Sequence, residues 1–246
     1  MDKTVLITGA SRGIGKFTAL HLAQKGYNIA FCYNSSKEKA EDVLKQINSI
    51  GAKGFMVKCD ISNEEEVKNM VNQVILTFGK IDILINNASV CFDSLFYDKK
   101  TSDFKKTMEV NILGTFLVSK YAGENMIQNK YGKIVNISST NGINTYYPMC
   151  IDYDASKAGI ISLSHNLAIQ FAPFVNVNCI APGFIATESE ISGMDEDFIK
   201  LEEDKILLKR AGTEQDIANL IEFLISDKAS YINSSVIRID GGMYGE

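Results

Sequence analysis

Residues 8–15 read Thr-Gly-Ala-Ser-Arg-Gly-Ile-Gly, and this glycine-rich stretch is the clearest indication of the fold. It follows a short apolar run, residues 4–8, and opens a helical pattern that continues to about Lys25. Gly9 permits a tight turn, Gly13 lets the backbone approach a pyrophosphate, and Gly15 lets the helix pack closely on the strand. The free N–H groups at the start of the helix attract the anion. The stretch therefore predicts a phosphate-binding loop at the first strand–helix junction, although glycines also occur in tight turns that bind nothing.

The rest of the chain alternates short apolar runs with longer amphipathic stretches. Apolar strands separated by helices are typical of a parallel sheet that helices cover on both faces. We therefore predict that residues 1–246 form one α/β domain, doubly wound around a seven-stranded parallel sheet. The predicted strands are residues 4–8, 28–33, 53–58, 83–86, 133–138, 175–180 and 236–240, and the predicted helices are residues 13–25, 37–50, 101–127, 153–171 and 214–225, with one more that starts after a Ser62 N-cap.

The composition excludes several classes of protein. The chain has 246 residues, of which 46% are hydrophobic and 22% charged, and its formal net charge is −5. Without a basic block it lacks the electrostatic footprint of a nucleic-acid-binding protein, and an acidic surface argues against binding to anionic membranes. We find no signal peptide and no apolar segment long enough to span a bilayer, so we expect a cytoplasmic protein.

The cysteines point to a reduced, intracellular protein. They are odd in number and form no CxxC pair, so we expect structural thiols. His21 and His165 have no cysteine or carboxylate at ligand spacing, so we expect no metal site. The five cysteines are Cys32, Cys59, Cys91, Cys150 and Cys179.

The choice between NAD and NADP depends on the segment after the second predicted strand. An acidic residue there would bind the ribose 2′-hydroxyl of NAD. Residues 32–37 read Cys-Tyr-Asn-Ser-Ser-Lys, and the first acid is Glu38. Arg12 and Lys37 can instead face a 2′-phosphate, since a guanidinium donates to phosphate in bidentate fashion. We therefore expect NADP(H) rather than NAD(H), the alternative being that both cations are simply solvated.

Four polar residues form a candidate catalytic set. Tyr153 and Lys157 are four residues apart in a predicted helix and share one face, and a nearby ammonium favours the phenolate form of tyrosine. Ser139, which we place at the end of the fifth strand, could donate to a substrate carbonyl oxygen. Asn111 lies inside the long predicted helix and could order a water that relays protons to Lys157. Each of these features alone also occurs by chance in proteins without catalytic activity.

Taken together, these residues resemble the short-chain dehydrogenase/reductase family over essentially the whole chain. The resemblance implies a Rossmann-like fold, a nicotinamide cofactor, a homotetramer and reversible hydride transfer between nicotinamide and a carbonyl carbon. It is carried by residues 8–15, Asp60, Asn86-Asn87-Ala88, Asn111, Ser139, Tyr153, Lys157 and the run Pro182-Gly183-Phe184-Ile185-Ala186-Thr187.

The resemblance also implies a role for each residue. Tyr153 would be the general acid in reduction, and Lys157 would lower the pKa of Tyr153 and hold the nicotinamide ribose. Asn111, Ser139, Tyr153 and Lys157 would form the catalytic tetrad. Asp60 and Ile61 would border the adenine, Asn87 and Ala88 the ribose, and Ile185 and Thr187 the nicotinamide carboxamide; the remaining cofactor contacts would be Gly9, Ser11, Arg12, Gly13, Ile14, Gly15, Asn34, Pro182 and Gly183.

Within the family, the chain is most similar to the 3-oxoacyl-acyl-carrier-protein reductases, through residues 178–185 and 239–244. This similarity implies an acyl-thioester substrate and acyl carrier protein as a possible partner. Ser89 and residues 233–235 depart from the pattern of those reductases, and Asn129 and Pro173 stand near the places where arginines would dock the carrier. The alternatives are a reductase or dehydrogenase of a sugar, steroid or small ketone, a non-catalytic nucleotide-binding regulator, and a lyase or epimerase that uses nicotinamide transiently.

A long irregular segment, residues 183–208, follows the sixth predicted strand. Its residues are rich in acidic side chains, and a segment of this length inside a compact domain is usually functional or mobile. We predict a substrate lid, because ligands bind beyond the carboxyl ends of parallel strands. The alternative is a solvated surface excursion with one short helix.

Overall fold

Seven strands form one parallel sheet in the computed structural model, which describes residues 3–144, 147–187 and 191–243. Residues 188–190 of the predicted lid and Tyr244, which we included in the family resemblance, lie outside the described residues. The strand order is β3-β2-β1-β4-β5-β6-β7, and the predicted fold class is confirmed. The strands are β1 (Thr4–Ile7), β2 (Asn28–Tyr33), β3 (Gly54–Lys58), β4 (Ile83–Asn86), β5 (Gly132–Ile137), β6 (Val175–Pro182) and β7 (Val236–Ile239).

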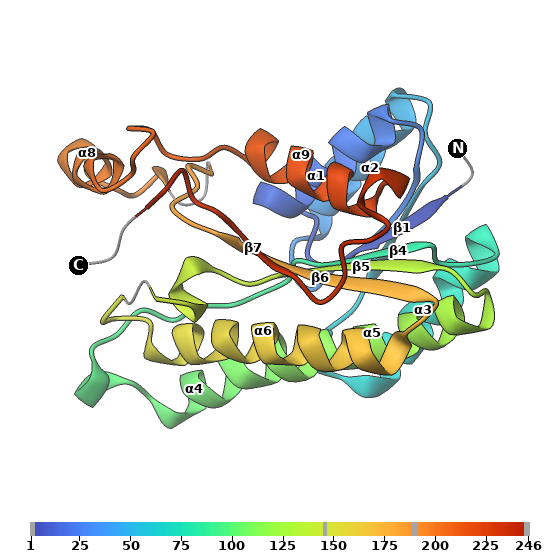
Figure 1. Cartoon of the computed structure of the whole chain (residues 1–246), viewed down its shortest axis with the longest axis horizontal. Coiled ribbons are helices and arrows are strands. Elements are labelled where there is room, and N and C mark those ends of the chain that lie inside the picture. Colours follow the sequence, from blue (N-terminus) through green and yellow to red (C-terminus); the bar gives the residue numbers. More distant parts are fainter. Residues whose placement is uncertain (1–2, 145–146, 188–190, 244–246) are drawn as a thin grey trace.

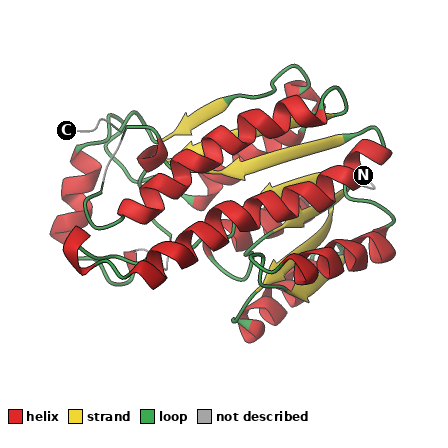
Figure 2. Cartoon of the chain, turned by 90° about the horizontal axis from the view of Figure 1, so that it is seen from below, coloured by secondary structure: helices red, strands yellow, loops and turns green. Residues whose placement is uncertain are grey.

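Helices cover both faces of the sheet, as Figure 1 shows. Three lie on one face: α1 (Gly13–Gln24), α2 (Lys37–Ser49) and α9 (Glu214–Ile225). Four lie on the other: α3 (Glu64–Phe78), α4 (Thr101–Met108), α5 (Thr115–Gln128) and α6 (Ile151–Phe171), and Figure 2 shows these helices across the strands from below. The remaining elements are α8 (Glu196–Asp204) and the short turns η1 (Phe96–Asp98), η2 (Glu109–Gly114), η3 (Thr140–Gly142) and η4 (Asp227–Ala229).

Strand β2 explains why the strands are apolar along their whole length. Ile29 and Phe31 belong to the core beneath α1, α2 and α9, whereas Ala30 and Cys32 belong to the core on the opposite face. Because successive side chains of a strand point to opposite faces, a sheet covered on both sides buries all of them. The sheet thereby becomes a rigid platform for the loops at its carboxyl edge.

The order in which the chain adds strands to the sheet reverses between β1 and β4. From β1 the chain runs outward to β2 and β3, then returns to place β4 on the other side of β1. The loops after these two strands therefore diverge and leave a crevice, which is where parallel α/β sheets bind ligands. Among the described residues, no helix combines the length and apolar character that a membrane span requires.

Two local predictions are wrong and one needs refinement. The predicted helix 101–127 is helical throughout, but its middle part, η2, is π-helical and contains Asn111. The N-cap of α3 is Asn63, whose side chain accepts hydrogen bonds from two backbone amides, while Ser62 donates to Asp60 instead. Ser139 lies two residues beyond β5 and caps η3, because the strand ends at Ile137.

Candidate functional site

The glycine-rich loop joins β1 to α1 with the geometry that a phosphate loop requires. Gly9 has a φ of +68°, and a Cβ there would lie 2.9 Å from Ala88 Cα. A Cβ at Gly15 would lie 2.5 Å from Asn87 Nδ2 and 2.7 Å from Gly9 O. Gly13, with a φ of +52°, faces open space. Two glycines therefore permit close packing, and the third leaves room above the N-terminus of α1 for an anion.

Asn87 and Thr8 lock this loop to the end of β4. Asn87 Nδ2 donates to the carbonyl oxygens of Thr8 and Gly9 at 3.0 and 3.1 Å. The Thr8 hydroxyl accepts hydrogen bonds from the amides of Asn87 and Ala88, both at 3.0 Å. Asn87 and Ala88 thus lie at the crevice, where the family resemblance places a ribose.

The predicted adenosine contacts surround the outer part of this edge. Arg12 is exposed at the N-cap of α1, and Asn34 is exposed just after β2. Asp60 follows β3, where its carboxylate accepts from Ser62 and from Lys106. Ile61 is buried beside it. Ser11 and Arg12 lie in the loop after β1, and Lys37 begins α2 after the neighbouring strand β2. Lys37 Nζ lies 3.6 Å from Glu41 Oε1 on the same helix.

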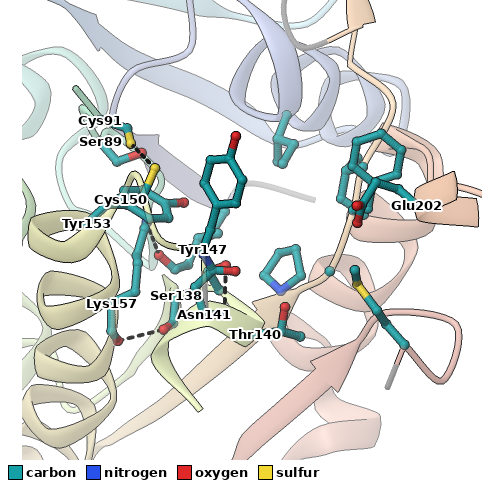
Figure 3. A pocket seen from close by; sticks show the side chains of 18 of the residues that line it. Ser89, Cys91, Ser138, Thr140, Asn141, Tyr147, Cys150, Tyr153, Lys157 and Glu202 are labelled. Atoms are coloured by element: carbon teal, nitrogen blue, oxygen red, sulfur yellow. Dashed lines mark hydrogen bonds between the residues drawn. The ribbon is translucent and has the colours of Figure 1, made fainter. Parts of the chain in front are cut away.

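A cavity of about 840 Å³ lies at the carboxyl edge of the sheet and gathers three of the four predicted catalytic residues. Ser139, Tyr153 and Lys157 line it, and Figure 3 shows Tyr153 and Lys157 projecting from the same helix, α6. Lys157 Nζ lies 5.2 Å from the centre of the Tyr153 ring. Ile14, Asn87, Pro182, Gly183 and Ile185 line the same cavity, whereas Thr187 is buried next to it.

The amino group of Lys157 is almost completely shielded from solvent. Its side chain is 2% exposed, and Nζ donates to Ile137 O at 2.9 Å. Burial lowers the pKa of Lys157 to about 8. The backbone carbonyl of Lys157 accepts from the hydroxyl of Ser138 at 2.7 Å, which attaches α6 to the end of β5. This attachment by Ser138 is a contact that our sequence reasoning missed.

The Asn111 side chain ties together three segments. Its Nδ2 donates to Val90 O at 3.0 Å and to Ser156 Oγ at 2.9 Å, and its Oδ1 accepts from Val90 N at 2.8 Å. The π-helical turn η2 supplies this residue, and such turns are frequent at functional sites. The amide thus holds the loop after β4 against α6, and the water relay to Lys157 stays a prediction.

The first turn of α6 is anchored by a buried ion pair. Lys99 Nζ donates to Asp152 Oδ1 at 2.8 Å, and Thr107 Oγ1 donates to Asp152 Oδ2 at 2.7 Å. Burial opposes ionisation of Asp152, but the hydrogen bonds from Lys99 and Thr107 outweigh it and lower its pKa. Because Asp152 directly precedes Tyr153, the pair fixes the helix that carries the phenol.

The predicted lid segment contributes one wall of the cavity. Met194, Phe198 and Glu202 line it, and Lys205 pairs with Glu202 at 2.8 Å. Helix α8 lies beyond the carboxyl edge of the sheet (Figure 1). This wall of the cavity therefore combines apolar and charged side chains.

The cavity also contains a cysteine cluster that the sequence did not predict. Cys91 and Cys150 have their sulfurs 3.0 Å apart, and Asp93 lies against both. The two cysteines are far apart in the sequence, and the loop after β4 meets the start of α6 only in three dimensions. Spacing rules for cysteine motifs therefore could not find this cluster.

Comparison with known proteins agrees with the geometry. A family model described as Enoyl-(Acyl carrier protein) reductase matches residues 9–244. The chain is 38% identical over 245 residues to the 3-oxoacyl-[acyl-carrier-protein] reductase FabG of Staphylococcus epidermidis, covering 99% of this chain and 100% of that one. It is 40% identical over 248 residues to FabG of Staphylococcus aureus, covering 99% of each chain. The crystal structure of levodione reductase superposes with a TM-score of 0.90 at 31% identity, covering 98% of this chain and 97% of that one.

The family model matches almost the whole chain, and the relatives are similar over their full length. Both findings are consistent with the parallel sheet, the glycine-rich loop and the cavity. The chain is an oxidoreductase and belongs to the short-chain dehydrogenase/reductase family.

Proposed function

We propose that this oxidoreductase uses NADPH to reduce the ketone of a 3-oxoacyl thioester to the corresponding alcohol. The observation that supports the chemistry is the meeting of Ser139, Tyr153 and Lys157 in one cavity, with Lys157 Nζ 5.2 Å from the Tyr153 ring. The full-length identity to 3-oxoacyl-[acyl-carrier-protein] reductases supports the substrate.

The residues at the carboxyl edge of the sheet fit a dinucleotide. Open space above Gly13 at the N-terminus of α1 suits a pyrophosphate, and Asn87 and Ala88 stand where a ribose would lie. Arg12 would hold the 2′-phosphate that distinguishes NADPH from NADH. Ile185 and Thr187 would face the carboxamide, and Lys157 the nicotinamide ribose. When bound, the nicotinamide supplies the hydride.

Three side chains would orient the ketone and protonate its oxygen. Ser139 donates a hydrogen bond to the carbonyl oxygen, which orients it and stabilises the negative charge that develops there. Tyr153 transfers its phenolic proton to that oxygen as the carbonyl carbon accepts the hydride, so that an alcohol results. The ammonium of Lys157 favours the phenolate of Tyr153 and eases this transfer. Solvent then returns the proton to Tyr153 through the Asn111 relay.

A substrate panel tests this function. NADPH oxidation is measured with acetoacetyl-coenzyme A, acetoacetyl carrier protein, crotonyl-coenzyme A, and steroid, sugar and simple ketones. We expect turnover of both acetoacetyl thioesters, a higher kcat/KM for the carrier-linked one, and none with crotonyl-coenzyme A. The crotonyl arm separates ketone reduction from the enoyl reduction that the family model's description names. Activity on a simple ketone with none on either thioester would overturn the substrate assignment.

The charge of α8 bears on where an acyl carrier protein would dock. Helix α8 carries five acidic side chains, and an acyl carrier protein is itself acidic, so like charges oppose docking there. We propose that the carrier approaches away from α8 and that the protein works as a cytoplasmic homotetramer. Light scattering of the purified protein tests the assembly, and a monomer would contradict it.

A further inference from the structure

The cysteine cluster in the cavity consists of Cys91, Asp93 and Cys150. The two Sγ atoms lie 3.0 Å apart, and Asp93 Oδ1 lies 3.3 Å from Cys91 Sγ and 3.0 Å from Cys150 Sγ. All three residues line the same cavity as Tyr153, and Figure 3 shows the sulfurs of Cys91 and Cys150 facing one another. The catalytic mechanism uses none of them.

The two segments that carry the cluster are held together independently of it. Ser94 N donates to Met149 O at 3.0 Å, and Lys99 pairs with Asp152 at 2.8 Å. Cys150 is the N-cap of α6, and its amide donates to Tyr147 O at 2.9 Å. The backbone contacts and the buried ion pair therefore hold the two segments, and with them the three residues of the cluster, close together.

Two thiols and one carboxylate are a donor set that suits zinc. Zinc binds thiolate sulfur at about 2.3 Å and carboxylate oxygen at about 2.0–2.2 Å, in tetrahedral geometry. A tetrahedral angle at that Zn–S length separates two sulfurs by about 3.8 Å, so the sulfurs of Cys91 and Cys150 need to part by less than about 1 Å. From this cluster we propose that Cys91, Asp93 and Cys150 form a zinc-binding site with three protein ligands and a fourth position open to the substrate cavity.

Asp93 distinguishes this proposal from a disulfide between the same cysteines. A disulfide would bring the sulfurs to about 2.05 Å and remove both S–H groups that now donate to Asp93. Zinc binding instead employs all three ligand atoms; each thiol loses its proton to solvent and the carboxylate becomes a ligand. Water or an oxygen of a molecule in the cavity would take the fourth position.

The test is metal binding by the full-length, fully reduced protein, measured by competition with a chromogenic zinc chelator. We expect one equivalent of zinc to bind to the wild type, and Cys91→Ser, Cys150→Ser and Asp93→Asn each to weaken binding at least tenfold. Asp93 is exposed, so Asp93→Asn should leave the fold intact even if a cysteine variant misfolds. Cys59→Ser, which alters a buried thiol in another part of the chain, is the matched control and should bind zinc like the wild type.

Cobalt(II) provides a second readout that does not depend on activity. Cobalt in the site should give a sulfur-to-metal charge-transfer band that Cys91→Ser and Cys150→Ser abolish. Zinc binding of equal strength in the wild type and the three site variants would overturn the proposal, as would cobalt binding without the thiolate band. The proposal would also be overturned if the reduced protein took up no zinc but formed a Cys91–Cys150 disulfide in air, as detected by peptide mapping.

Discussion

Lys157, which we propose assists the reaction, carries its charge in a buried position. Its pKa in the folded protein is about 8, against 10.5 as the ordinary value. Below pH 8 the group is protonated in both the folded and unfolded chains, and burial of its charge destabilises the fold. As pH rises from about 8 to 10.5 the folded protein releases this proton first, so that the destabilisation disappears.

We therefore expect Lys157→Met to stabilise the cofactor-free protein at pH 7 while it abolishes turnover. The shift from 10.5 to about 8 corresponds to about 3 kcal/mol, and loss of the hydrogen bond to Ile137 offsets about 1 kcal/mol of it. Urea unfolding at pH 7 and pH 10 measures the effect. The gain should shrink at pH 10, and a variant less stable than the wild type at pH 7 would refute the argument.

Arg12 carries the proposed preference for NADPH. It is exposed at the start of α1, and no acid stands between β2 and Glu38 to bind a ribose 2′-hydroxyl. Arg12→Ala should weaken NADPH binding by about tenfold or more, as expected for a charge-assisted hydrogen bond worth roughly 1.5–3 kcal/mol, and leave NADH binding nearly unchanged. Fluorescence titration with both cofactors checks this, with Lys39→Ala on the exposed side of α2 as the control. Equal losses for both cofactors would mean that Arg12 does not contact the 2′-phosphate.

At the scale of elements, the start of α6 depends on the Lys99–Asp152 pair. Both side chains are almost completely buried, at 5% and 0% exposure. Asp152→Asn leaves the Lys99 charge without its carboxylate, which typically costs about 3–5 kcal/mol. We expect that loss in thermal or urea unfolding and a lower kcat, because Tyr153 follows directly. The control is Glu65→Gln, which removes an exposed ion pair with Lys68 and should change stability by less than about 1 kcal/mol; similar losses in both variants would contradict the account.

Helix α9 begins with a capping box that Arg210 reinforces. The Thr213 side chain accepts from Asp216 N, and Asp216 in turn accepts from Thr213 N and from Arg210. Hydrogen bonds from Arg210 lower the pKa of Asp216 to about 2. Because the folded pKa lies below the unfolded value of 3.8, this stabilisation is present above about pH 4 and is lost as pH falls toward 2.

Asp216→Asn should therefore destabilise the protein by about 1 kcal/mol at pH 7, after allowance for solvent screening of this partly exposed group. The difference from the wild type should shrink as pH falls toward 2, because about half of the wild-type carboxyl groups are then protonated. Urea unfolding at several pH values gives both numbers. A difference that persists unchanged at the lowest pH would show that the cap and not the charge accounts for it.

The elements that the sequence predicted well are those with local signals at both ends. Helix α9 matches its prediction because the cap at Thr213 and the break at Ser226 are coded within a few residues. The π-helical turn at Glu109–Gly114 has no such local signal, because the apolar periodicity of the surrounding helix continues through it. The hydrogen-bond partners of Asn111 in this turn belong to the loop after β4 and to α6, which are distant in the sequence.

At the scale of the whole molecule, the order of motifs predicted the fold. A parallel sheet brings the ends of β1, β4, β5 and β6 to one edge, so residues after these strands converge without any further information. The cysteine cluster and the lid contacts of Phe198 and Glu202 lie on loops whose paths depend on tertiary packing. The spacing of residues along the chain does not predict these contacts. Because the same loops line the cavity, the sequence alone does not identify the substrate either.

We propose that Tyr153 donates the proton in an NADPH-dependent ketone reduction. The most direct test is single-turnover oxidation of bound NADPH after mixing with acetoacetyl-coenzyme A, in the wild type and in Tyr153→Phe. Because general acid catalysis is worth about 10²–10⁴-fold, the variant should be slower by that factor while binding NADPH with nearly unchanged affinity. A variant that keeps more than about a tenth of the wild-type rate would show that another group protonates the carbonyl oxygen.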